Sequence, residues 1–283
     1  MNQKILVTGG AGFIGTNLIK RLVSEGHQVV SLDNYETGTE TNHVEGVKYI
    51  NGDIETIEYI KGDYDLCYHL AAQSRVQPSF DDPTESFRVN VNGTRAVCEW
   101  ARQNNIKLIY AGSSSKHHDP SDSPYAMYKY LGEKVCKLYR KSYGLDVEIT
   151  RFYNVYGPHE SLDEMNGNVI GIWRSRLNKN KILHIVGDGE QRRDFTHVDD
   201  IVSALIMISD GVSSHDDAWE LGTGVNYSIN ELALLFKMRF QCDFEYIEDQ
   251  PGNYRETLRE NDDAYQYFGW KPTDRLKEYI NEL

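Results

Sequence analysis

The feature that most constrains the fold is a glycine-rich turn between a strand and a helix at the start of the chain. Ile5-Leu6-Val7 is a short apolar run typical of a buried strand. Gly9, Gly12 and Gly15 follow, and apolar residues then recur at helical spacing. In this context the glycines allow a tight turn, a close backbone approach to a pyrophosphate, and close packing of helix on strand. The helix N-terminus adds free N–H groups for phosphates. The turn therefore predicts a dinucleotide site, to which we also assign Phe13 and Ile14.

An acidic residue at the end of the next apolar run indicates which dinucleotide binds. Residues 28–32 read as a strand that ends in Asp33, about twenty residues past the glycines. A carboxylate at this place hydrogen-bonds the 2′-hydroxyl of a ribose, and it would repel a 2′-phosphate. We therefore expect NAD rather than NADP as the cofactor, with Asn34 beside the same ribose.

Strands and helices alternate through the first two thirds of the chain, which predicts an α/β fold with a doubly wound parallel sheet. Strands are expected at 4–8, 28–32, 47–50, 65–70, 106–112 and 146–151, and helices at 13–25, 54–60, 83–104 and 124–143. After residue 160 polar turns at 161–168, 187–190 and 209–217 separate helices at 168–178, 198–209, 228–238 and 274–282. We expect a cofactor domain over 1–160, with returning segments near 194–222, and a smaller α/β substrate-binding cap over 161–283.

Charge and cysteine content narrow the class of protein. The net charge of −13 argues against a nucleic-acid partner and against an anionic membrane surface. The four cysteines are far apart in the sequence, so neither a disulfide framework nor a metal site is suggested, and Cys98 and Cys136 are expected as buried thiols. The chain runs straight into a strand, without a signal peptide or an apolar run long enough for a membrane span. These features predict a cytoplasmic enzyme.

Ligands of such sheets bind beyond the carboxyl ends of the strands, so the residues that follow each strand are site candidates. Asp53 ends the third strand, where it could hydrogen-bond an adenine amino group or equally cap the next helix. His69 ends the fourth strand and is interpreted as a strand histidine whose ring is hydrogen-bonded within the protein, rather than as a catalytic base. To the cofactor site we assign, besides Asp53, the residues Ile54, Leu70, Ala71, Ala72, Gln73, Asn90 and Tyr153.

A serine, a tyrosine and a lysine together predict hydride-transfer chemistry on an alcohol. Ser113 ends the fifth strand, and Tyr125 and Lys129 lie four residues apart at the start of a helix, so they share one face of it. A free tyrosine has a pKa of about 10, and a neighbouring ammonium group favours the phenolate. Such a set can remove a proton from a sugar alcohol while hydride leaves for the cofactor. If Tyr125 and Lys129 were considered alone, the simpler interpretation would be two surface residues on one helix face. The glycine turn, Asp33 and the serine at the end of the fifth strand favour the catalytic interpretation instead.

With these motifs in hand, the chain resembles the extended short-chain dehydrogenase/reductases, and specifically the NAD-dependent nucleotide-sugar epimerase/dehydratase group. The resemblance spans nearly the whole chain. It depends on the motifs at 8–15, 69–72, 125–129, 151–158 and 187–195. It implies a Rossmann-type domain, bound NAD, a Ser113/Tyr125/Lys129 catalytic set and a nucleoside-diphosphate sugar as substrate.

The same resemblance implies a substrate diphosphate between the two parts of the chain. It places Asn154 and Arg193 on the phosphates, and an arginine fork matches phosphate geometry. Arg255 resembles a second phosphate arginine, although the family usually has an acid where Asn253 stands. Further substrate contacts are assigned to Gln73, Ser114, Ser115, Asn168 and Val169.

Two departures from the family pattern bear on the reaction. Ser114 and Ser115 stand where dehydratases carry an acidic pair, and Ser115 also stands where 3,5-epimerases carry a cysteine. Since serine performs neither role well, chemistry at C4 alone remains. The segment 116–124 is also shorter than the family's loop over the sugar. Its His117 and His118 are either a replacement acid/base or turn residues.

The sequence thus predicts an NAD-dependent nucleotide-sugar epimerase, most similar to the UDP-glucose 4-epimerases, that acts through a transient 4-keto sugar. The alternatives are a dehydratase, a decarboxylase or a 4-keto-sugar reductase of the same family, and more distantly a non-catalytic NAD-binding sensor. Members of the family commonly pair through two helices, so we expect a homodimer through 83–104 and 124–143. On these helices the expected contact residues are Val91, Val97, Trp100, Val135, Leu138 and Tyr139.

Overall fold

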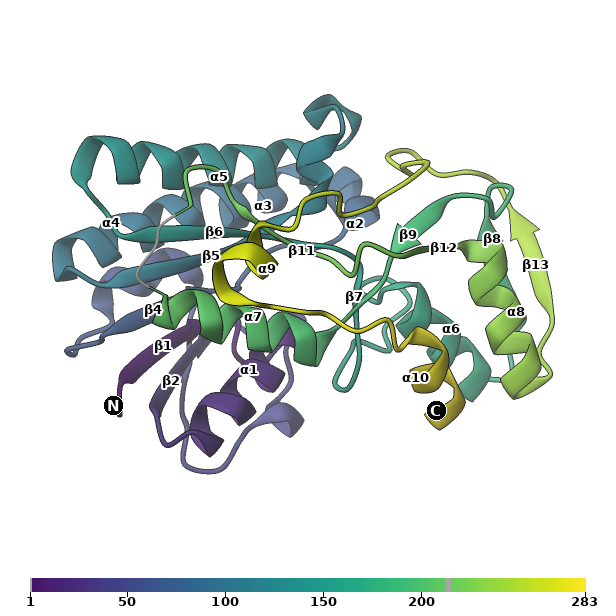
Figure 1. Cartoon of the computed structure of the whole chain (residues 1–283), viewed down its shortest axis with the longest axis horizontal. Helices are drawn as coiled ribbons and strands as arrows, with labels where there is room; N and C mark the ends of the chain where they lie inside the picture. Colours follow the sequence, from purple (N-terminus) through teal and green to yellow (C-terminus); the bar gives the residue numbers. More distant parts are fainter. Residues whose placement is uncertain (1, 212–214) are drawn as a thin grey trace.

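The apolar runs of the sequence form a seven-stranded parallel sheet in the computed structural model, which describes residues 2–211 and 215–283 (Figure 1). Its strands follow the order β11-β6-β5-β4-β1-β2-β3, and neighbours pair in parallel throughout. This confirms the expected doubly wound α/β fold. The bounds are β1 (Lys4–Thr8), β2 (Gln28–Asp33), β3 (Lys48–Asn51), β4 (Leu66–His69), β5 (Lys107–Ser113), β6 (Val147–Phe152) and β11 (Trp219–Leu221).

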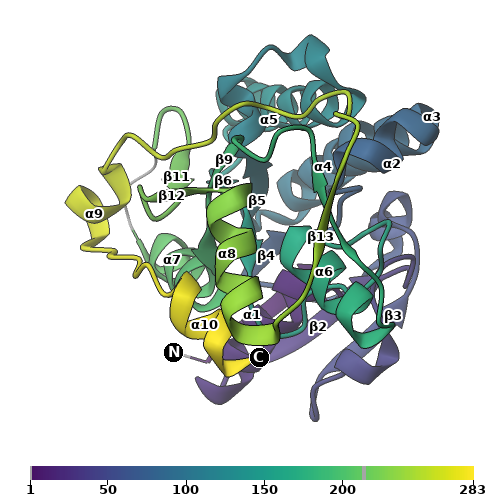
Figure 2. The ribbon, with the colours of Figure 1, turned by 90° about the vertical axis from the view of Figure 1, so that its right-hand side faces the viewer.

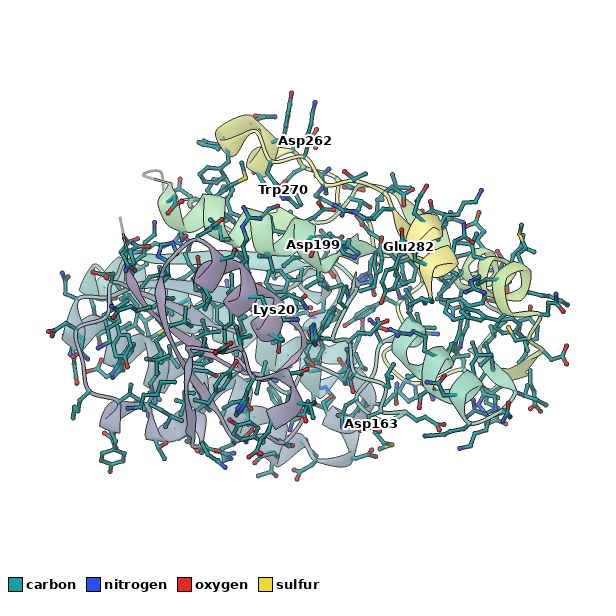
Figure 3. All side chains as sticks on the ribbon, turned by 90° about the horizontal axis from the view of Figure 1, so that it is seen from below. Lys20, Asp163, Asp199, Asp262, Trp270 and Glu282 are labelled. Atoms are coloured by element: carbon teal, nitrogen blue, oxygen red, sulfur yellow. The ribbon has the colours of Figure 1, made fainter. Side chains whose placement is uncertain are left out.

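Helices cover both faces of this sheet, as parallel strands require. In Figure 1 the upper face is covered by α4 (Thr94–Asn104) and α5 (Pro124–Tyr143). These helices share one apolar core with strand residues such as Leu108 of β5 and Ile149 of β6. The lower face is covered by α1 (Phe13–Ser24) and α7 (Val198–Asp210), around a second core that includes Ile5 and Trp219. Figure 3 views the lower face, where α1 carries Lys20 and α7 carries Asp199. Trp270, from the C-terminal part of the chain, is attached to α7 by a hydrogen bond from its Nε1 to the Asp200 carbonyl at 2.9 Å.

The single helix expected over 83–104 is divided in the structure. It consists of α3 (Pro83–Phe87), a π-helical turn η3 (Arg88–Gly93) and α4, and the short α2 (Val76–Asp81) precedes it. The Asp82 side chain caps α3 by accepting from the Glu85 N–H. A wide turn of this kind lets Asn90 point inward, and π-turns are often found at functional sites.

The C-terminal part forms a cap beside the carboxyl ends of the strands. It contains α6 (Val169–Asn178), β8 (Leu183–Val186), α8 (Ile229–Phe240), β13 (Phe244–Ile247) and α10 (Leu276–Glu282) around a third apolar core that includes Trp173 and Phe236. Figure 2 looks directly at this cap, with α8 running vertically through the middle of the view and β13 to its right. The strands β8 and β13 are parallel neighbours, although neither was predicted.

The chain returns to the main body after residue 194, but not as one continuous segment of the sheet. β10 (Thr196–His197) pairs with β7 (Val155–Tyr156), outside the seven-stranded sheet, while β11 adds the edge strand beside β6. β9 (Arg192–Asp194) and β12 (Asn226–Ser228) form an antiparallel pair between the two parts. α9 (Asp263–Phe268) lies against β11. Of the turn expected at 209–217, residues 212–214 lie outside the described ranges.

Short 3₁₀ turns complete the connections. They are η1 (Glu40–Asn42), η2 (Ile54–Tyr59), η4 (Ser114–His117) and η5 (Pro120–Asp122). The last two turns occupy the segment between β5 and α5. Across the described ranges, none of the helices has the length and apolar character that crossing a membrane would need.

Candidate active site

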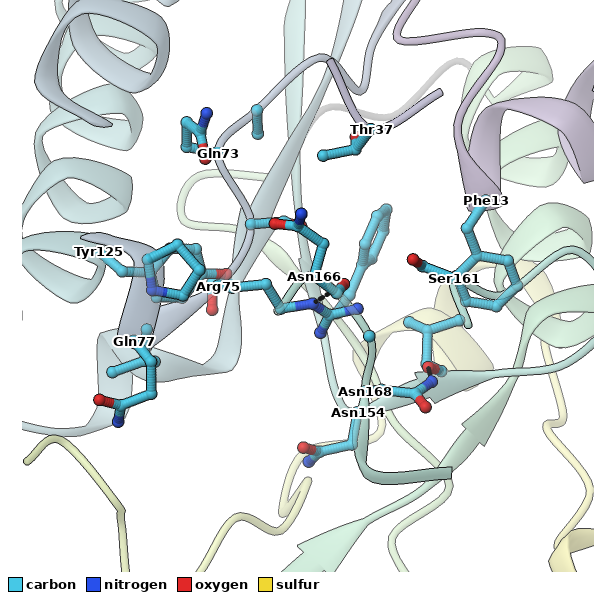
Figure 4. A pocket seen from close by; sticks show the side chains of 18 of the residues that line it. Phe13, Thr37, Gln73, Arg75, Gln77, Tyr125, Asn154, Ser161, Asn166 and Asn168 are labelled. Carbon is cyan, nitrogen blue, oxygen red and sulfur yellow. Dashed lines mark hydrogen bonds between the residues drawn. The ribbon is translucent and has the colours of Figure 1, made fainter. Parts of the chain in front are cut away.

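A large cavity of about 880 Å³ lies between the carboxyl edge of the sheet and the cap. Typical ligand pockets hold about 300 to 1,000 Å³, so this cavity is at the upper end of that range. Its walls include the loops after β1, β2, β4, β5 and β6, because the carboxyl ends of parallel strands share one edge. The cap contributes residues of α6, β9 and the segment that follows β13. Figure 4 shows side chains from both parts that point into this space.

The glycine turn forms one end of the cavity. Gly9 has a φ of +73°, and a Cβ there would lie 2.7 Å from the Ala71 amide nitrogen. A Cβ on Gly15 would lie 2.2 Å from the Gly9 carbonyl oxygen, so the helix packs against the turn only without a side chain. Around Gly12, in contrast, a Cβ would contact only the Gly9 carbonyl oxygen, at 3.3 Å. The turn therefore leaves its backbone open toward the cavity, as a pyrophosphate requires.

Asp33 stands at the end of β2 and lines the same end of the cavity. Its carboxylate accepts from the Ala11 N–H at 2.9 Å and from the Tyr35 N–H at 2.8 Å, so its position is fixed by the turn that it faces. Asn34 and Glu36 line the cavity beside it. This cluster of acid oxygens suits ribose hydroxyls and opposes a phosphate.

Tyr125, Lys129 and Ser113 all line the cavity. Ser123 caps α5 by accepting from the Ala126 N–H, and Pro124 occupies the first turn, so the helix begins directly before Tyr125. Lys129 lies one turn further on and is buried, and its Nζ donates to the Ala111 carbonyl at 2.6 Å. Ser113 ends β5, and its hydroxyl accepts from the Ser115 N–H at 3.2 Å and lies close enough to Tyr125 to lower the pKa of the phenol.

Burial changes the acidity of both titratable groups in this set. It raises the pKa of Tyr125 above the ordinary value, against the opposing effects of the Ser113 hydroxyl and of the positive charge of Arg75. Burial also lowers the pKa of Lys129 to about 8. The protein alone therefore holds Tyr125 neutral, and the phenolate requires further positive charge beside it.

The cap wall carries the groups that suit a diphosphate. The Arg193 guanidinium donates to the Asn253 side-chain carbonyl at 2.7 Å and to the Arg192 backbone carbonyl. Burial lowers its pKa to about 10. The Asn154 amide donates to Thr257 at 2.9 Å. Asn168 caps α6 by accepting from the Gly171 N–H, and Val169, Gln73, Ser114 and Ser115 also line the cavity.

Four residues assigned to the site from the sequence lie outside the cavity wall. Asp53 caps η2 and forms an ion pair with Arg88 at 2.7 Å. Of the two roles expected for Asp53, it therefore has the helix cap, and it lies outside the cavity wall from which it could contact an adenine. Asn90 is buried and holds the backbone of Gln73, accepting from its N–H and donating to its carbonyl. The Tyr153 hydroxyl donates to Glu220 at 2.8 Å, and Phe152 lines the cavity in its place. The fourth residue is Arg255, which pairs with Asp188 at 2.9 Å on the exposed side of the cap.

The histidines of the short segment after β5 do not line the cavity either. The His117 ring donates from Nε2 to the Glu220 carboxylate at 2.9 Å, and this carboxylate also accepts from Arg151. His118 stacks on Tyr254, with ring centroids 3.9 Å apart. His69 is buried, its two ring nitrogens hydrogen-bond with Thr8 and Thr94, and burial lowers its pKa to about 3.

Sequence reasoning missed several cavity residues that come from loops. Arg75 lies two residues after Gln73 and enters the cavity, and Asn166, Gln191 and Tyr254 come from the cap. A basic residue so soon after the fourth strand is a signal that could have singled out Arg75. The cap residues belong to irregular segments, where no apolar periodicity and no recognisable motif indicates a site residue.

Comparison with known proteins places this geometry in context. The sequence profile of the NAD dependent epimerase/dehydratase family matches residues 5–222. UDP-glucose 4-epimerase of Mycolicibacterium smegmatis is 32% identical over 304 residues, which cover 98% of this chain and 96% of that protein.

Solved structures of similar proteins superpose over nearly the whole chain. UDP-glucose 4-epimerase of Thermotoga maritima, solved with UDP-glucose, has a TM-score of 0.91 and 28% identity, covering 98% of this chain and 96% of that one. UDP-glucuronic acid 4-epimerase of Bacillus cereus, solved with UDP-glucuronic acid and NAD, has a TM-score of 0.90 and 25% identity, with coverage of 98% and 96%.

Proposed function

The chain belongs to the NAD dependent epimerase/dehydratase family, and we propose that it is a nucleotide-sugar 4-epimerase that works through a transient 4-keto sugar. The observation that carries the proposal is that Ser113, Tyr125 and Lys129 line one cavity together with the glycine turn, and that the cap contributes Arg193 to the same cavity. This arrangement offers one place for a cofactor, one for a diphosphate, and a base between them.

The cofactor is NAD, which when bound accepts a hydride from the sugar and returns it. The residues present fit it, because the open backbone at Gly12 and the carboxylate of Asp33 match a pyrophosphate and a ribose diol. Gly9, Gly15 and the Leu70–Ala72 segment complete this end of the cavity. Lys129 would hold the nicotinamide ribose, since its ammonium group is buried in the wall directly below Tyr125.

Tyr125 would act as the general base. Its hydroxyl lies near that of Ser113, and a sugar C4 hydroxyl placed between them can give its proton to the phenolate oxygen. Ser113 would then hold the oxygen of the resulting ketone, and the Lys129 charge favours the phenolate. On the return step Tyr125 gives the proton back to the same oxygen.

Epimerisation requires the ketone to present its other face before hydride returns. Arg193 and Asn154, on the cap wall, would hold the diphosphate throughout, because a guanidinium fork matches phosphate oxygens. With the diphosphate held, the sugar can turn about the bonds that link it to the phosphate.

Ser114 and Ser115 favour an epimerase over the alternatives. Dehydration needs an acid and a base beside C5 and C6, and serine hydroxyls hold their protons too tightly for either role. Ser115 is buried, and its Oγ has no hydrogen-bond partner among the described residues, so nothing in these ranges activates it. The two serines would instead contact sugar hydroxyls.

A product assay tests this function directly. We would incubate the NAD-loaded protein with UDP-, GDP-, TDP- and CDP-linked hexoses and resolve products by NMR and mass spectrometry. A 4-epimer of unchanged mass, with NAD retained, is the expected result. Loss of water would indicate a dehydratase, loss of carbon dioxide a decarboxylase, and release of NADH a net oxidoreductase, and each of these would refute the proposal.

We also propose that the enzyme is a homodimer that pairs through α4 and α5. The structure supports a narrower contact than the sequence suggested, because Val97, Trp100 and Tyr139 are buried in the chain's own core. Leu138 remains 53% exposed on α5 and Tyr143 remains 58% exposed. In a symmetric dimer, α4 and α5 of one protomer would pack against the same two helices of its partner and would cover both side chains.

A further inference from the structure

Arg75 is a basic side chain of the cavity to which the reaction proposed above assigns no role. It precedes α2 on the sheet side, and Figure 4 shows it crossing the cavity from the Tyr125 wall toward the cap. Its Nε donates to the Asn166 backbone carbonyl at 2.8 Å. The two terminal nitrogens of the guanidinium make no hydrogen bond within residues 2–211 and 215–283, and the side chain lines the cavity.

No carboxylate pairs with Arg75 anywhere in residues 2–211 and 215–283. An acid that contributes to its electrostatic environment, Glu160, already accepts from Arg174 at 2.8 Å, from Tyr279 and from Asn168. Arg75 is partly buried, and this burial lowers its pKa. A desolvated guanidinium without an anion is costly, so the protein maintains here a charge that a ligand can neutralise.

The other cations of the cavity are occupied or assigned. Arg176 pairs with Glu164 at 2.8 Å, and Lys129 is bonded to the Ala111 carbonyl below Tyr125. Arg193 has no carboxylate partner in the described ranges, and the substrate diphosphate is its expected anion. Arg75 is therefore a second cavity arginine without a carboxylate partner in the described ranges, and it comes from the loop after β4 whereas Arg193 comes from β9 of the cap.

The place of Arg75 identifies where its anion would lie. The guanidinium is close enough to Tyr125 for its charge to act on that hydroxyl. Under the proposed mechanism Tyr125 contacts the oxygen on C4, and C6 is bonded to C5, which is bonded to C4. A group on C6 would therefore lie in the same part of the cavity as Arg75, whereas the diphosphate on C1 lies at the far side of the sugar ring.

We propose that the substrate is a nucleoside-diphosphate uronic acid, and that Arg75 binds its C6 carboxylate. The inference rests on the proposed 4-epimerase function and deepens it. A carboxylate can accept two parallel N–H bonds from a guanidinium, and this arrangement adds both binding energy and orientation. A C6 hydroxymethyl group would offer one neutral oxygen and leave the buried charge uncompensated.

The test compares two substrates that differ only at C6, UDP-glucuronic acid and UDP-glucose, in the NAD-loaded enzyme. For Arg75→Met, kcat/KM should fall by about 30-fold or more with UDP-glucuronic acid and change by less than about threefold with UDP-glucose, because only the charged substrate loses a buried ion pair. Arg21→Met is the matched control, since Arg21 is 53% exposed on α1 and pairs only with Glu25, and it should change neither value.

Equal losses with both substrates would overturn the inference, because Arg75 would then act through its bond to Asn166 as a structural link to the cap. Unchanged kcat/KM with both substrates would overturn it too. A binding measurement separates this from failure of the proposed function: we would titrate both sugars into NAD-loaded Tyr125→Phe protein, with and without Arg75→Met. Tighter binding of UDP-glucuronic acid that Arg75→Met abolishes supports the inference even if the wild type epimerises neither sugar, and equal binding refutes it.

Discussion

Replacing Tyr125 by phenylalanine removes one hydroxyl and keeps the ring, so it isolates the proton-transfer step. The ring packs in the cavity wall at the first turn of α5, and the hydroxyl contributes to catalysis only through the Ser113 contact and the sugar oxygen. Loss of a general base costs about 100- to 10,000-fold in rate, which corresponds to about 3 to 5 kcal/mol of barrier. We expect kcat to fall by this factor while the fold and the bound NAD are retained.

The pH dependence supplies a second measure of the same residue. Burial raises the pKa of Tyr125, and the base works only when deprotonated, so wild-type kcat/KM should rise with pH by about tenfold per unit below the apparent pKa. The residual activity of Tyr125→Phe should lack this rise. Lys129→Met should slow the reaction and weaken NAD binding together, because Lys129 is assigned to both the phenolate and the ribose.

Tyr128→Phe is the matched control for this experiment. Tyr128 lies on the same helix, packs edge-on against Phe87 with ring centroids 5.3 Å apart, and lies outside the cavity wall. Its hydroxyl has no hydrogen-bond partner within the described ranges, so the substitution should leave kcat almost unchanged. If Tyr128→Phe is the inactive variant, the motif is misaligned. If both variants keep full activity on a confirmed substrate, the Ser/Tyr/Lys mechanism is wrong.

The remaining predictions concern the cofactor, the diphosphate and the assembly. NAD should bind at least about 100-fold more tightly than NADP, because a 2′-phosphate would face the Asp33 carboxylate, and equal affinities in a calorimetric titration would refute that assignment. Arg193→Ala should raise the KM for the nucleotide sugar by about 30-fold or more without changing NAD affinity, and loss of NAD affinity at constant KM would place Arg193 on the wrong side of the cavity. Leu138→Arg should convert a dimer into a monomer in sedimentation at micromolar concentration, and a wild type that is already monomeric there would exclude the proposed assembly.

Much of the candidate site could be predicted because a parallel sheet gathers the ends of its strands. Gly9, Asp33, Leu70 and Ser113 are far apart in the sequence, yet each directly follows or ends a strand, and all line one cavity. The period of the apolar residues identified the strands, and their topology determined which residues meet. Tyr125 was predictable for a further reason, since its helix begins at a recognisable Ser-Pro cap.

The sequence could not determine side-chain direction where regular structure ends. Phe152 and Tyr153 are neighbours at the end of β6, and only Phe152 lines the cavity. Side chains alternate between the two faces of a sheet only while the strand continues, so the alternation does not predict the direction of a side chain beyond its end. Asp53 was ambiguous because its ion-pair partner, Arg88, lies on a distant π-turn. Arg75 was missed since its position depends on Asn166, a backbone contact from another part of the chain.

The repeated passage of the chain between sheet and cap has a consequence for how such an enzyme would move. The chain leaves the sheet after β6, returns through β10 and α7, leaves again after β11, and comes back once more at α9 before ending in α10 (Figure 1). A hinge with a single connection can open widely, whereas parallel connections restrain one another. The cap should therefore stay nearly fixed during turnover, and the large motion would belong to the substrate. The half-reacted ketone would rotate within a cavity of nearly constant shape and would stay bound through its diphosphate between the two hydride transfers.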